Sequence, residues 1–426
     1  MSTIVVLGGG IGGLSAAFEL KDELGDAHDI VLVSDQEHFE FTPSNPWVAV
    51  KWRKPAAIRL DLNELMPKHG IRFVSQAVKR VQPESHNLLL ENDEILPYNF
   101  LVIASGPRLA FDEIPGLGPH GGYTQSVCKT DHAALIAEKF DAFCANPGPV
   151  VVGAAQGASC YGPAYEYTFI IETELRKRKI RDRVPMVFVT PEPYVGHLGL
   201  EGGGDTKSLL ESEMRERHIK WHTNTRIDSV EEGLMKVTEV NEDGTDKASH
   251  EIEFAHSMIL PAFTGIDAVM GVEGLSNPRG FILVDEHQRN PTFPEIFAVG
   301  VCVAIPPVGP SPLPVGVPKT GYMIESMVTA TVQNISEILE GKEPTHHATW
   351  NAFCLADFGD RGVAFMALPQ IPPRNTNWSG SGKWVHWAKV GFEKYYMRKI
   401  RQGRVEPFFE KYAMRLMGVQ KLRNPG

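Results

Sequence analysis

A strand-turn-helix segment at residues 149–169 decides the fold of this chain, and it reads PVVVGAAQGASCYGPAYEYTF. The β-branched run from Val150 to Val152 precedes small residues and then a helix-like stretch, as at the start of a nucleotide-binding βαβ unit. A turn that binds a dinucleotide needs the pattern G-x-G-x-x-G, because its backbone must approach the pyrophosphate closely. Here Ala155 stands at the second glycine position, and Cys160 follows the turn. The segment therefore predicts a dinucleotide-binding fold in which a thiol has replaced the nicotinamide site.

A second glycine-rich turn, at the N-terminus, keeps the full pattern. It runs from residue 8 to 13, between a predicted strand at 4–7 and a predicted helix from about 14 to 24. The first glycine permits the tight turn, the second admits the pyrophosphate, and the third lets the helix pack against the strand. The next predicted strand, 29–33, ends beside polar side chains that can face a ribose. We therefore expect a dinucleotide site formed by Gly8, Gly10, Gly12, Gly13, Ser34 and Asp35.

Two further motifs indicate which dinucleotide is bound. A buried strand within 98–107 ends in Ala-Ser-Gly, which resembles the Ala-Thr-Gly motif of flavin-dependent disulfide reductases. Another strand, 294–299, ends in a glycine, although Val301 replaces the aspartate that binds the flavin ribityl chain in those enzymes. The three motifs occur in the order of that family, so FAD rather than NAD is the expected cofactor. The residues expected to bind it here are Ala104, Ser105, Gly106 and Gly300.

A proline-rich segment follows the third motif. Residues 306–318 contain six prolines, which make a chain stiff and extended because each fixes φ and removes an N–H donor. A surface linker is one interpretation, and a rigid wall of the flavin pocket is the one we favour. Lys319, Thr320 and Gly321 come next, and a helix opening near Thr320 is expected to aim its N-terminus at the flavin, where negative charge develops on reduction.

Composition and charge limit the class of protein. The chain has 426 residues, enough for two or three domains, and a net charge of −10, which argues against a nucleic-acid binder. The five cysteines are widely spaced, which is not the pattern of a disulfide scaffold or a zinc site. We expect Cys144 and Cys302 to be inert buried thiols. Neither a signal peptide nor a transmembrane helix is predicted.

The C-terminal tail differs from the rest of the chain. Residues 383–426 carry eleven Lys or Arg and three Glu, a net charge of +8, so the remainder carries −18. Trp384, Trp387 and Tyr395 fall at helical spacing among these cations, and Gly403 breaks the pattern before a second apolar group. Such helices suit insertion into one leaflet of an anionic membrane, although an ordinary helix covering the core has the same pattern. The second group comprises Phe408, Phe409, Tyr412, Leu416 and Met417.

Taken together, these segments resemble the sulfide:quinone oxidoreductases, monotopic membrane flavoproteins of the disulfide-reductase superfamily. The resemblance covers nearly the whole chain. It rests on Val127-Cys128, on the run 157–166, on Pro318 to Tyr322, and on Cys354 ahead of the run 357–362. The family has three essential cysteines, which correspond here to Cys128, Cys160 and Cys354.

The resemblance implies a mechanism. Cys160 and Cys354 are expected to face the flavin, bridged by a disulfide or a polysulfur chain that hydrogen sulfide attacks by thiol–disulfide exchange. The thiolate freed in this way, assigned to Cys354, passes two electrons to the flavin while polysulfide grows. In some relatives the thiol equivalent to Cys128 tethers FAD, and in others it acts in sulfide entry or polysulfide release. Both roles stay open here.

The electrons are then expected to pass to a quinone, ubiquinone, menaquinone or a similar one, in the bilayer. The resemblance places the quinone near the tail, with Phe392 as the candidate that stacks on its ring and Lys319 close to the reduced flavin. Glu166, on the helix after Cys160, is a candidate for keeping sulfide or a thiol deprotonated. His132 and His197 are further candidates, since histidine titrates near neutrality.

The expected fold class is α/β, with two Rossmann-like domains of the FAD-dependent disulfide-reductase type and a C-terminal amphipathic membrane-binding region. The first part of the FAD-binding domain covers residues 1–117, and its second part covers 276–345. A second Rossmann-like domain without an NAD site lies between them, at 118–275, and 346–426 form the C-terminal domain. The expected location is the surface of a bacterial inner membrane, on either side. The sequence also leaves a homo-oligomer open.

Three other functions are compatible with parts of this pattern. A type II NADH:quinone dehydrogenase shares the fold and the tail, but it needs a second G-x-G-x-x-G, which is absent here. A flavocytochrome sulfide dehydrogenase keeps two flavin-facing cysteines, but it is exported and pairs with a haem subunit. A non-catalytic flavin-based sulfide sensor would use the Cys160–Cys354 pair without turnover.

Overall fold

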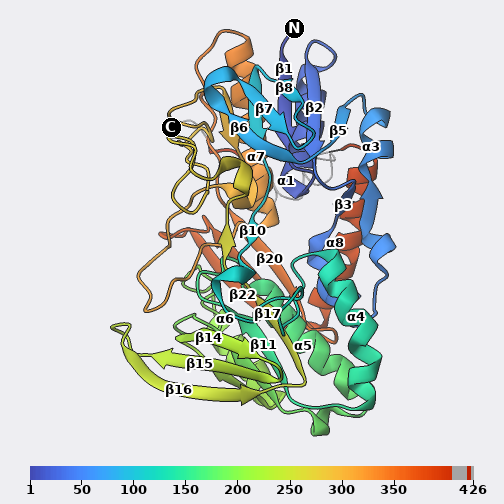
Figure 1. The fold of residues 1–426 in the computed structure, drawn as a ribbon, viewed down its shortest axis with the longest axis vertical. Helices are drawn as coiled ribbons and strands as arrows, with labels where there is room; N and C mark the ends of the chain where they lie inside the picture. The colour runs from blue at the N-terminus through green and yellow to red at the C-terminus, as the bar shows by residue number, and fades with distance from the viewer. Residues whose placement is uncertain (405–419, 424–426) are drawn as a thin grey trace.

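The computed structural model describes residues 1–404 and 420–423. Its first sheet has five parallel strands in the order β19-β9-β1-β2-β5, and it occupies the upper part of the molecule in Figure 1. Strands buried on both faces are expected to be continuously apolar, and β1 is an example. The five strands are β1 (Thr3–Leu7), β2 (Asp29–Ser34), β5 (Arg72–Ser75), β9 (Phe100–Ile103) and β19 (Ile296–Ala298).

Two helices that are far apart in sequence pack together beside this sheet. They are α1 (Ile11–Leu24) and α7 (Gly321–Leu339). The first begins at the glycine-rich turn, and the second follows the proline-rich segment. The first helix starts at Ile11, three residues earlier than expected, because Gly10 already acts as its N-cap. Smaller elements of this half are α2 (Asn45–Ala49), α3 (Leu62–Lys68), β3 (His38–Glu40), β4 (Arg59–Asp61), β6 (Val78–Gln82), β7 (Asn87–Leu90) and β8 (Ile95–Pro97).

The second sheet has four parallel strands in the order β13-β12-β11-β17 and lies in the lower half of Figure 1. Its strands are β11 (Val150–Ala154), β12 (Met186–Val189), β13 (Ile219–His222) and β17 (His256–Leu260). Its helices are α4 (Thr130–Ala145), α5 (Gly162–Lys177) and α6 (Thr206–Glu216). An antiparallel meander follows β13 and comprises β14 (Thr225–Glu231), β15 (Leu234–Val240) and β16 (Asp246–Glu253). Residues 241–245 form the turn that joins β15 to β16. A short pair, β10 (Arg108–Leu109) and β18 (Phe263–Thr264), lies at the junction of the two halves.

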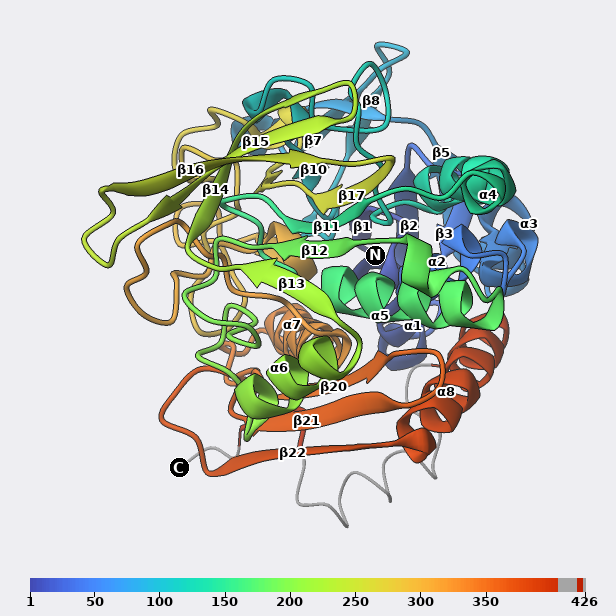
Figure 2. The same cartoon turned by 90° about the horizontal axis from the view of Figure 1, so that it is seen from below.

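The C-terminal part forms a third layer, seen along the bottom of Figure 2. It consists of an antiparallel sheet of β20 (Ala352–Asp357), β21 (Gly362–Leu368) and β22 (Thr376–Gly382), followed by helix α8 (Lys383–Arg401). Both α5 and α8 contact β20, so this sheet lies between the second Rossmann-like unit and the tail helix. The expected α/β fold class is therefore confirmed. The second apolar group predicted in the tail, from Phe408 to Met417, lies outside the described residues.

No helix among the described residues is long and apolar enough to cross a bilayer. The helix predicted in the tail is present, and it ends at Arg401, ahead of Gly403, as the sequence pattern indicates.

Candidate functional site

The N-terminal turn is folded as a phosphate-binding turn requires. Gly8 has φ +119°, and a Cβ there would lie 2.4 Å from the Ala104 carbonyl oxygen. A Cβ on Gly13 would lie 1.7 Å from the carbonyl oxygen of Gly8, so the helix can approach the strand only because Gly13 has no side chain. Ala104 in turn donates its N–H to Leu7 O over 2.8 Å, which joins the Ala-Ser-Gly segment to this turn.

Three glycines from three segments border open space rather than protein. A Cβ placed on Gly10, Gly106 or Gly321 would meet no other atom within 4 Å. The N-terminus of α7 has no side-chain cap, and the buried hydroxyl of its N-cap residue, Thr320, has no hydrogen-bond partner among the described residues. Two helix N-termini with free N–H groups around an open space suit a dinucleotide with a pyrophosphate. These residues therefore fit FAD.

The other predicted cofactor residues have different surroundings. Gly12 packs against Ile324 of α7 rather than bordering open space, since a Cβ there would lie 3.2 Å from that side chain. Ser34 is buried and its hydroxyl accepts the Gln36 N–H at 3.1 Å, whereas Asp35 is exposed at the end of β2. The Ser105 hydroxyl donates to Gly106 O at 3.3 Å, and Gly300 has φ +83° at the end of β19.

The turn after β11 is closed by the proline-rich segment. The N–H of Gly157, which would face a pyrophosphate in a nicotinamide site, donates to Pro314 O at 2.7 Å. The N–H of Gly316 donates to Ala158 O at 2.9 Å, and a Cβ on Gly316 would lie 2.5 Å from the Ser159 Cβ. The proline-rich segment therefore occupies the Gly157 donor of this turn and packs against the residues that follow it. This packing gives a physical reason for the missing nicotinamide site that the altered turn predicts.

Three of the five cysteines come together from separate segments. Cys160 lies between β11 and α5, Cys354 lies on β20, and Cys128 precedes α4. Burial, together with the neighbouring Cys128 and Cys354 thiols, raises the pKa of Cys160 to about 12. Burial also raises the pKa of Cys354 to about 12 and that of Cys128 to about 11. All three are free thiols in this structure.

Glu166 connects this thiol cluster to the tail helix. It is buried on α5, accepts the N–H of Asp357 at 2.7 Å, and forms an ion pair with Lys389 of α8. Burial raises the pKa of Glu166, and Lys389 opposes that rise. The charge of Glu166 in turn raises the pKa of both Cys160 and Cys354, so it lies within electrostatic reach of both thiols.

The partners of Glu166 were not found by sequence reasoning. Asp357 accepts the indole N–H of Trp47 at 2.7 Å and contacts His386 Nδ1 at 2.9 Å, so it joins α2 to α8 through the end of the Cys354 strand. The sequence carried one usable signal for Lys389, because it lies one helical turn after the apolar Val385, which is buried. The membrane interpretation of the tail treats its cations as one set, and Lys389 and Lys399 depart from it, because they are 4% and 3% exposed and form ion pairs inside the protein.

Lys319 lies between the proline-rich segment and α7. Burial lowers the pKa of its ammonium group to about 8, and the thiols of Cys302 and Cys160 act in the opposite direction. Lys319 therefore interacts electrostatically with Cys160 of the thiol cluster. Its ammonium group can release a proton at a pH only slightly above neutrality.

His132 and His197 do not titrate near neutrality, contrary to our expectation. Burial lowers the pKa of each imidazole to about 4, so both are neutral at pH 7. The ring of His132 packs against His120 and Phe111, and its Nδ1 is buried without a hydrogen-bond partner among the described residues. His197 Nδ1 accepts the N–H of Gly199 at 3.2 Å, which ties it to its own loop.

The outward face of α8 is aromatic. Trp384, Trp387 and Phe392 are 49%, 69% and 43% exposed, and Trp378 on the adjacent β22 is 42% exposed. Phe392 packs at its inner edge against Phe41, with ring centroids 6.1 Å apart.

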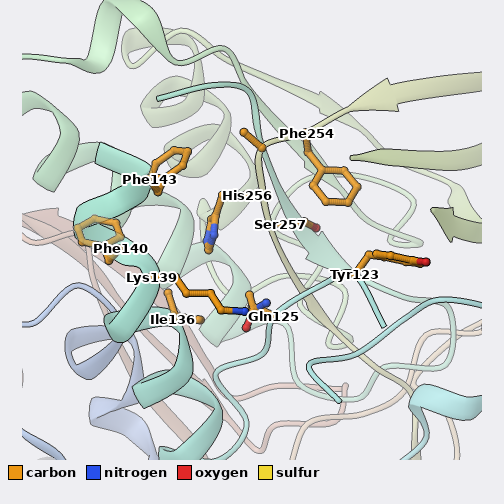
Figure 3. Close-up of a pocket in the computed structure, with 10 residues that line it drawn as sticks. Tyr123, Gln125, Ile136, Lys139, Phe140, Phe143, Phe254, His256 and Ser257 are labelled. Carbon is orange, nitrogen blue, oxygen red and sulfur yellow. The ribbon is translucent and has the colours of Figure 1, made fainter. Parts of the chain in front are cut away.

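A separate cavity lies between α4 and β17, away from the thiols (Figure 3). It has a volume of about 210 Å³, and no cysteine lines it. Phe140, Phe143 and His256 form its walls, and the buried Ser257 hydroxyl there has no hydrogen-bond partner among the described residues. The cavity therefore belongs to neither the cofactor cradle nor the thiol cluster.

Comparison with known proteins agrees with this geometry. Residues 2–331 match the family model described as pyridine nucleotide-disulphide oxidoreductase. A sulfide-quinone reductase of Aquifex aeolicus is 38% identical over 415 residues, which cover 97% of this chain and 94% of that protein. A mitochondrial sulfide:quinone oxidoreductase of Schizosaccharomyces pombe is 21% identical over 87% of this chain and 81% of that protein.

Solved structures give the same result. The crystal structure of the A. aeolicus sulfide:quinone oxidoreductase superposes with a TM-score of 0.95 at 37% identity, over 100% of this chain and 98% of that one. The NDH2 structure from Plasmodium falciparum, with a TM-score of 0.70 at 14% identity, shares the fold alone. Members of this superfamily are FAD-binding flavoproteins, in agreement with the glycine cradle. The chain belongs to the pyridine nucleotide-disulphide oxidoreductases and, within them, to the sulfide:quinone oxidoreductase family.

Proposed function

We propose that this chain is an FAD-dependent enzyme that oxidises hydrogen sulfide at the Cys128, Cys160 and Cys354 cluster and delivers the electrons to a quinone. The observation that carries the proposal is the meeting of three thiols beside a dinucleotide turn that the chain itself has closed. The membership of the chain in the sulfide:quinone oxidoreductase family supports the same conclusion.

The proposed chemistry begins on a Cys160–Cys354 disulfide. Hydrosulfide attacks the Cys160 sulfur, so a new S–S bond forms there as the bond to Cys354 breaks and its electron pair stays on Cys354 as thiolate. Cys160 then carries a persulfide. When the thiolate and the persulfide join as a trisulfide, two electrons leave for the acceptor and the persulfide proton is released. Further sulfides lengthen the chain until it departs as polysulfide.

Burial makes a thiolate at Cys354 costly, because it raises the pKa of that thiol to about 12. Lys389 lowers this pKa, and Lys319 does the same for Cys160. We therefore assign the two lysines the role of stabilising the anions of the exchange step. Glu166 holds Lys389 in place through their ion pair. Burial raises the pKa of Glu166, which favours the protonated form of its carboxyl group.

The cofactor would be held by residues of the open cradle. Gly8, Gly10 and Gly13 offer the pyrophosphate a close backbone approach, with Ser34 and Asp35 toward the ribose. Ala104, Ser105, Gly106, Gly300, Thr320 and Gly321 would line the remainder, with Gly12 behind them. FAD, when bound, supplies a two-electron carrier between the thiols and the quinone.

We propose further that the aromatic face of α8 lies in the interfacial region of a bilayer. Trp384, Trp387 and Trp378 are large and exposed, and tryptophan suits the headgroup level of a membrane. Phe392, on the same helix, would then contact the quinone ring. A bacterial inner membrane is the location we favour, with the enzyme bound peripherally.

Steady-state turnover in liposomes tests the proposal. Sulfide should reduce a short-chain ubiquinone or menaquinone in the presence of the purified flavoprotein, and NADH should not. Cys160→Ala should abolish the reaction, whereas Cys144→Ala, which changes a thiol on α4 away from the cluster, should leave it unchanged. A sulfide sensor would bind sulfide without turnover. Quinone reduction by NADH would instead favour the NADH dehydrogenase.

A further inference from the structure

Two histidines and a glutamate meet at the junction between the second Rossmann-like sheet and the meander. His222 Nδ1 lies 2.8 Å from Glu239 Oε1, and His250 Nε2 lies 3.2 Å from the same oxygen. The two imidazole rings are 4.9 Å apart between centroids. The three ligand atoms all lie within 4.8 Å of one another. All three side chains are partly buried, at 24%, 20% and 35% exposure for His222, Glu239 and His250.

The topology places these residues together for a simple reason. His222 is the last residue of β13, the edge strand of the parallel sheet. Glu239 and His250 belong to the paired strands β15 and β16, where Val237 lies opposite His250. Glu239 is two residues beyond Val237, so it projects from the same face of the meander as His250.

The donor set is one that divalent transition metals use. Two imidazole nitrogens and one carboxylate oxygen are the protein ligands of many zinc sites, with a water in the fourth position. Zinc–nitrogen and zinc–oxygen bonds of about 2.0–2.2 Å place tetrahedral ligands a little over 3 Å apart. The separations of 2.8 and 3.2 Å at Glu239 Oε1 are already close to that value. In addition, His250 Nε2 is buried and makes no hydrogen bond among the described residues, because its 3.2 Å contact with Glu239 Oε1 lacks hydrogen-bond geometry.

One neighbouring charge opposes a cation here. The ammonium of Lys247 lies 3.3 Å from Glu239 Oε2, the other oxygen of the same carboxylate. It leaves Oε1 available but adds a positive charge next to the site. Lys247 is 59% exposed, so its effect is screened by solvent.

We propose that His222, Glu239 and His250 form a binding site for a divalent transition-metal ion of the zinc class. The ion links the meander β14–β16 to the edge of the second Rossmann-like sheet. It is distinct from the thiol cluster, whose residues come from other elements. Binding therefore raises the stability of this half of the protein without entering the sulfide reaction.

The test measures zinc binding to the full-length flavoprotein by calorimetry and by metal analysis after dialysis. The wild type should bind one equivalent of Zn²⁺ more than the His222→Gln, His250→Gln double variant. The cysteines, which also attract zinc, are identical in both proteins, so their contribution cancels. Glu239→Gln should weaken this equivalent by more than about tenfold, the low end of what even outer-sphere changes cost at metal sites. Added zinc should raise the melting temperature of the wild type and not that of the double variant.

Loss of zinc binding in the double variant could also come from misfolding, so a variant that is expected to bind zinc more tightly serves as a second test. Lys247→Gln keeps all three ligands and removes the opposing charge, so it should bind zinc roughly threefold to tenfold more tightly. Lys236→Gln removes a cation from β15 that pairs with Glu231, away from the cluster, and should match the wild type. The proposal is overturned if the double variant binds as much zinc as the wild type with equal affinity. It is also overturned if Lys247→Gln and Lys236→Gln behave alike, or if the extra equivalent disappears only with His287 and His347, the other histidine pair beside a glutamate.

Discussion

Replacing Lys389 by methionine removes the cation that faces Glu166 inside the protein while keeping a side chain of similar length. Removing one partner of a buried ion pair typically costs about 3–5 kcal/mol, because the other charge is left without compensation. Lys389 is 4% exposed and Glu166 is 6% exposed, so this range applies to them. Glu166 has one way to escape the penalty, which is to bind a proton.

The proton makes the cost depend on pH, with a sign that the structure determines. An unfolded glutamate has a pKa of about 4.3, and burial raises the pKa of Glu166 above its ordinary value. The folded state therefore binds more protons than the unfolded state in this window, and stability falls as pH rises through it. Lys389 limits the rise of that pKa. In Lys389→Met the pKa rises further, so the loss continues to higher pH at about 1.4 kcal/mol per pH unit.

We expect Lys389→Met to be close to the wild type in stability near pH 5 and increasingly unstable toward pH 8. Urea unfolding at several pH values, followed by circular dichroism and flavin fluorescence, measures this difference. Lys394→Met is the matched control, because Lys394 is exposed on the same helix. Adding Glu166→Gln to Lys389→Met removes the titrating group and should flatten the pH dependence. The reasoning is refuted if Lys389→Met and Lys394→Met lose the same stability at every pH.

Three further predictions concern the thiols, the cradle and the tail. Cys354→Ala should keep the fold and FAD but lose the bleaching of the flavin by sulfide; bleaching at the wild-type rate would remove Cys354 from the mechanism. Gly13→Val should yield protein without flavin, because even a Cβ there would lie 1.7 Å from Gly8 O, and a normal flavin spectrum of the purified variant would contradict the assigned site. Trp384→Ser with Trp387→Ser should release the protein from anionic liposomes in a flotation assay while leaving its melting temperature unchanged. Retention on the liposomes would contradict the membrane assignment.

Much of the architecture could be predicted because it depends on local patterns. The glycine spacing at 8, 10 and 13 is a local signature of one turn, and a Cβ on Gly13 would lie 1.7 Å from the Gly8 carbonyl oxygen, so only glycine fits there. The start of α7 and the end of α8 followed from a cap position and a break in periodicity. The family resemblance supplied the cysteines, since residues 128, 160 and 354 meet only through tertiary packing.

What the sequence did not predict depends on contacts between distant segments. Nothing near Gly157 indicates that Pro314 would accept its N–H. The inward direction of Lys389 depends on a carboxylate 223 residues earlier in the chain. The neutrality of His132 and His197 at pH 7 likewise depends on burial, which spacing does not report.

The most direct test of the central claim mixes the purified flavoprotein, without oxygen, with sulfide and separately with NADH, and follows flavin absorbance. The account predicts that sulfide bleaches the flavin within seconds, that NADH leaves it oxidised, and that added quinone restores the colour. Bleaching by NADH and not by sulfide would contradict it, because the closed turn at Gly157 would then have admitted a nicotinamide and the thiol cluster would be incidental.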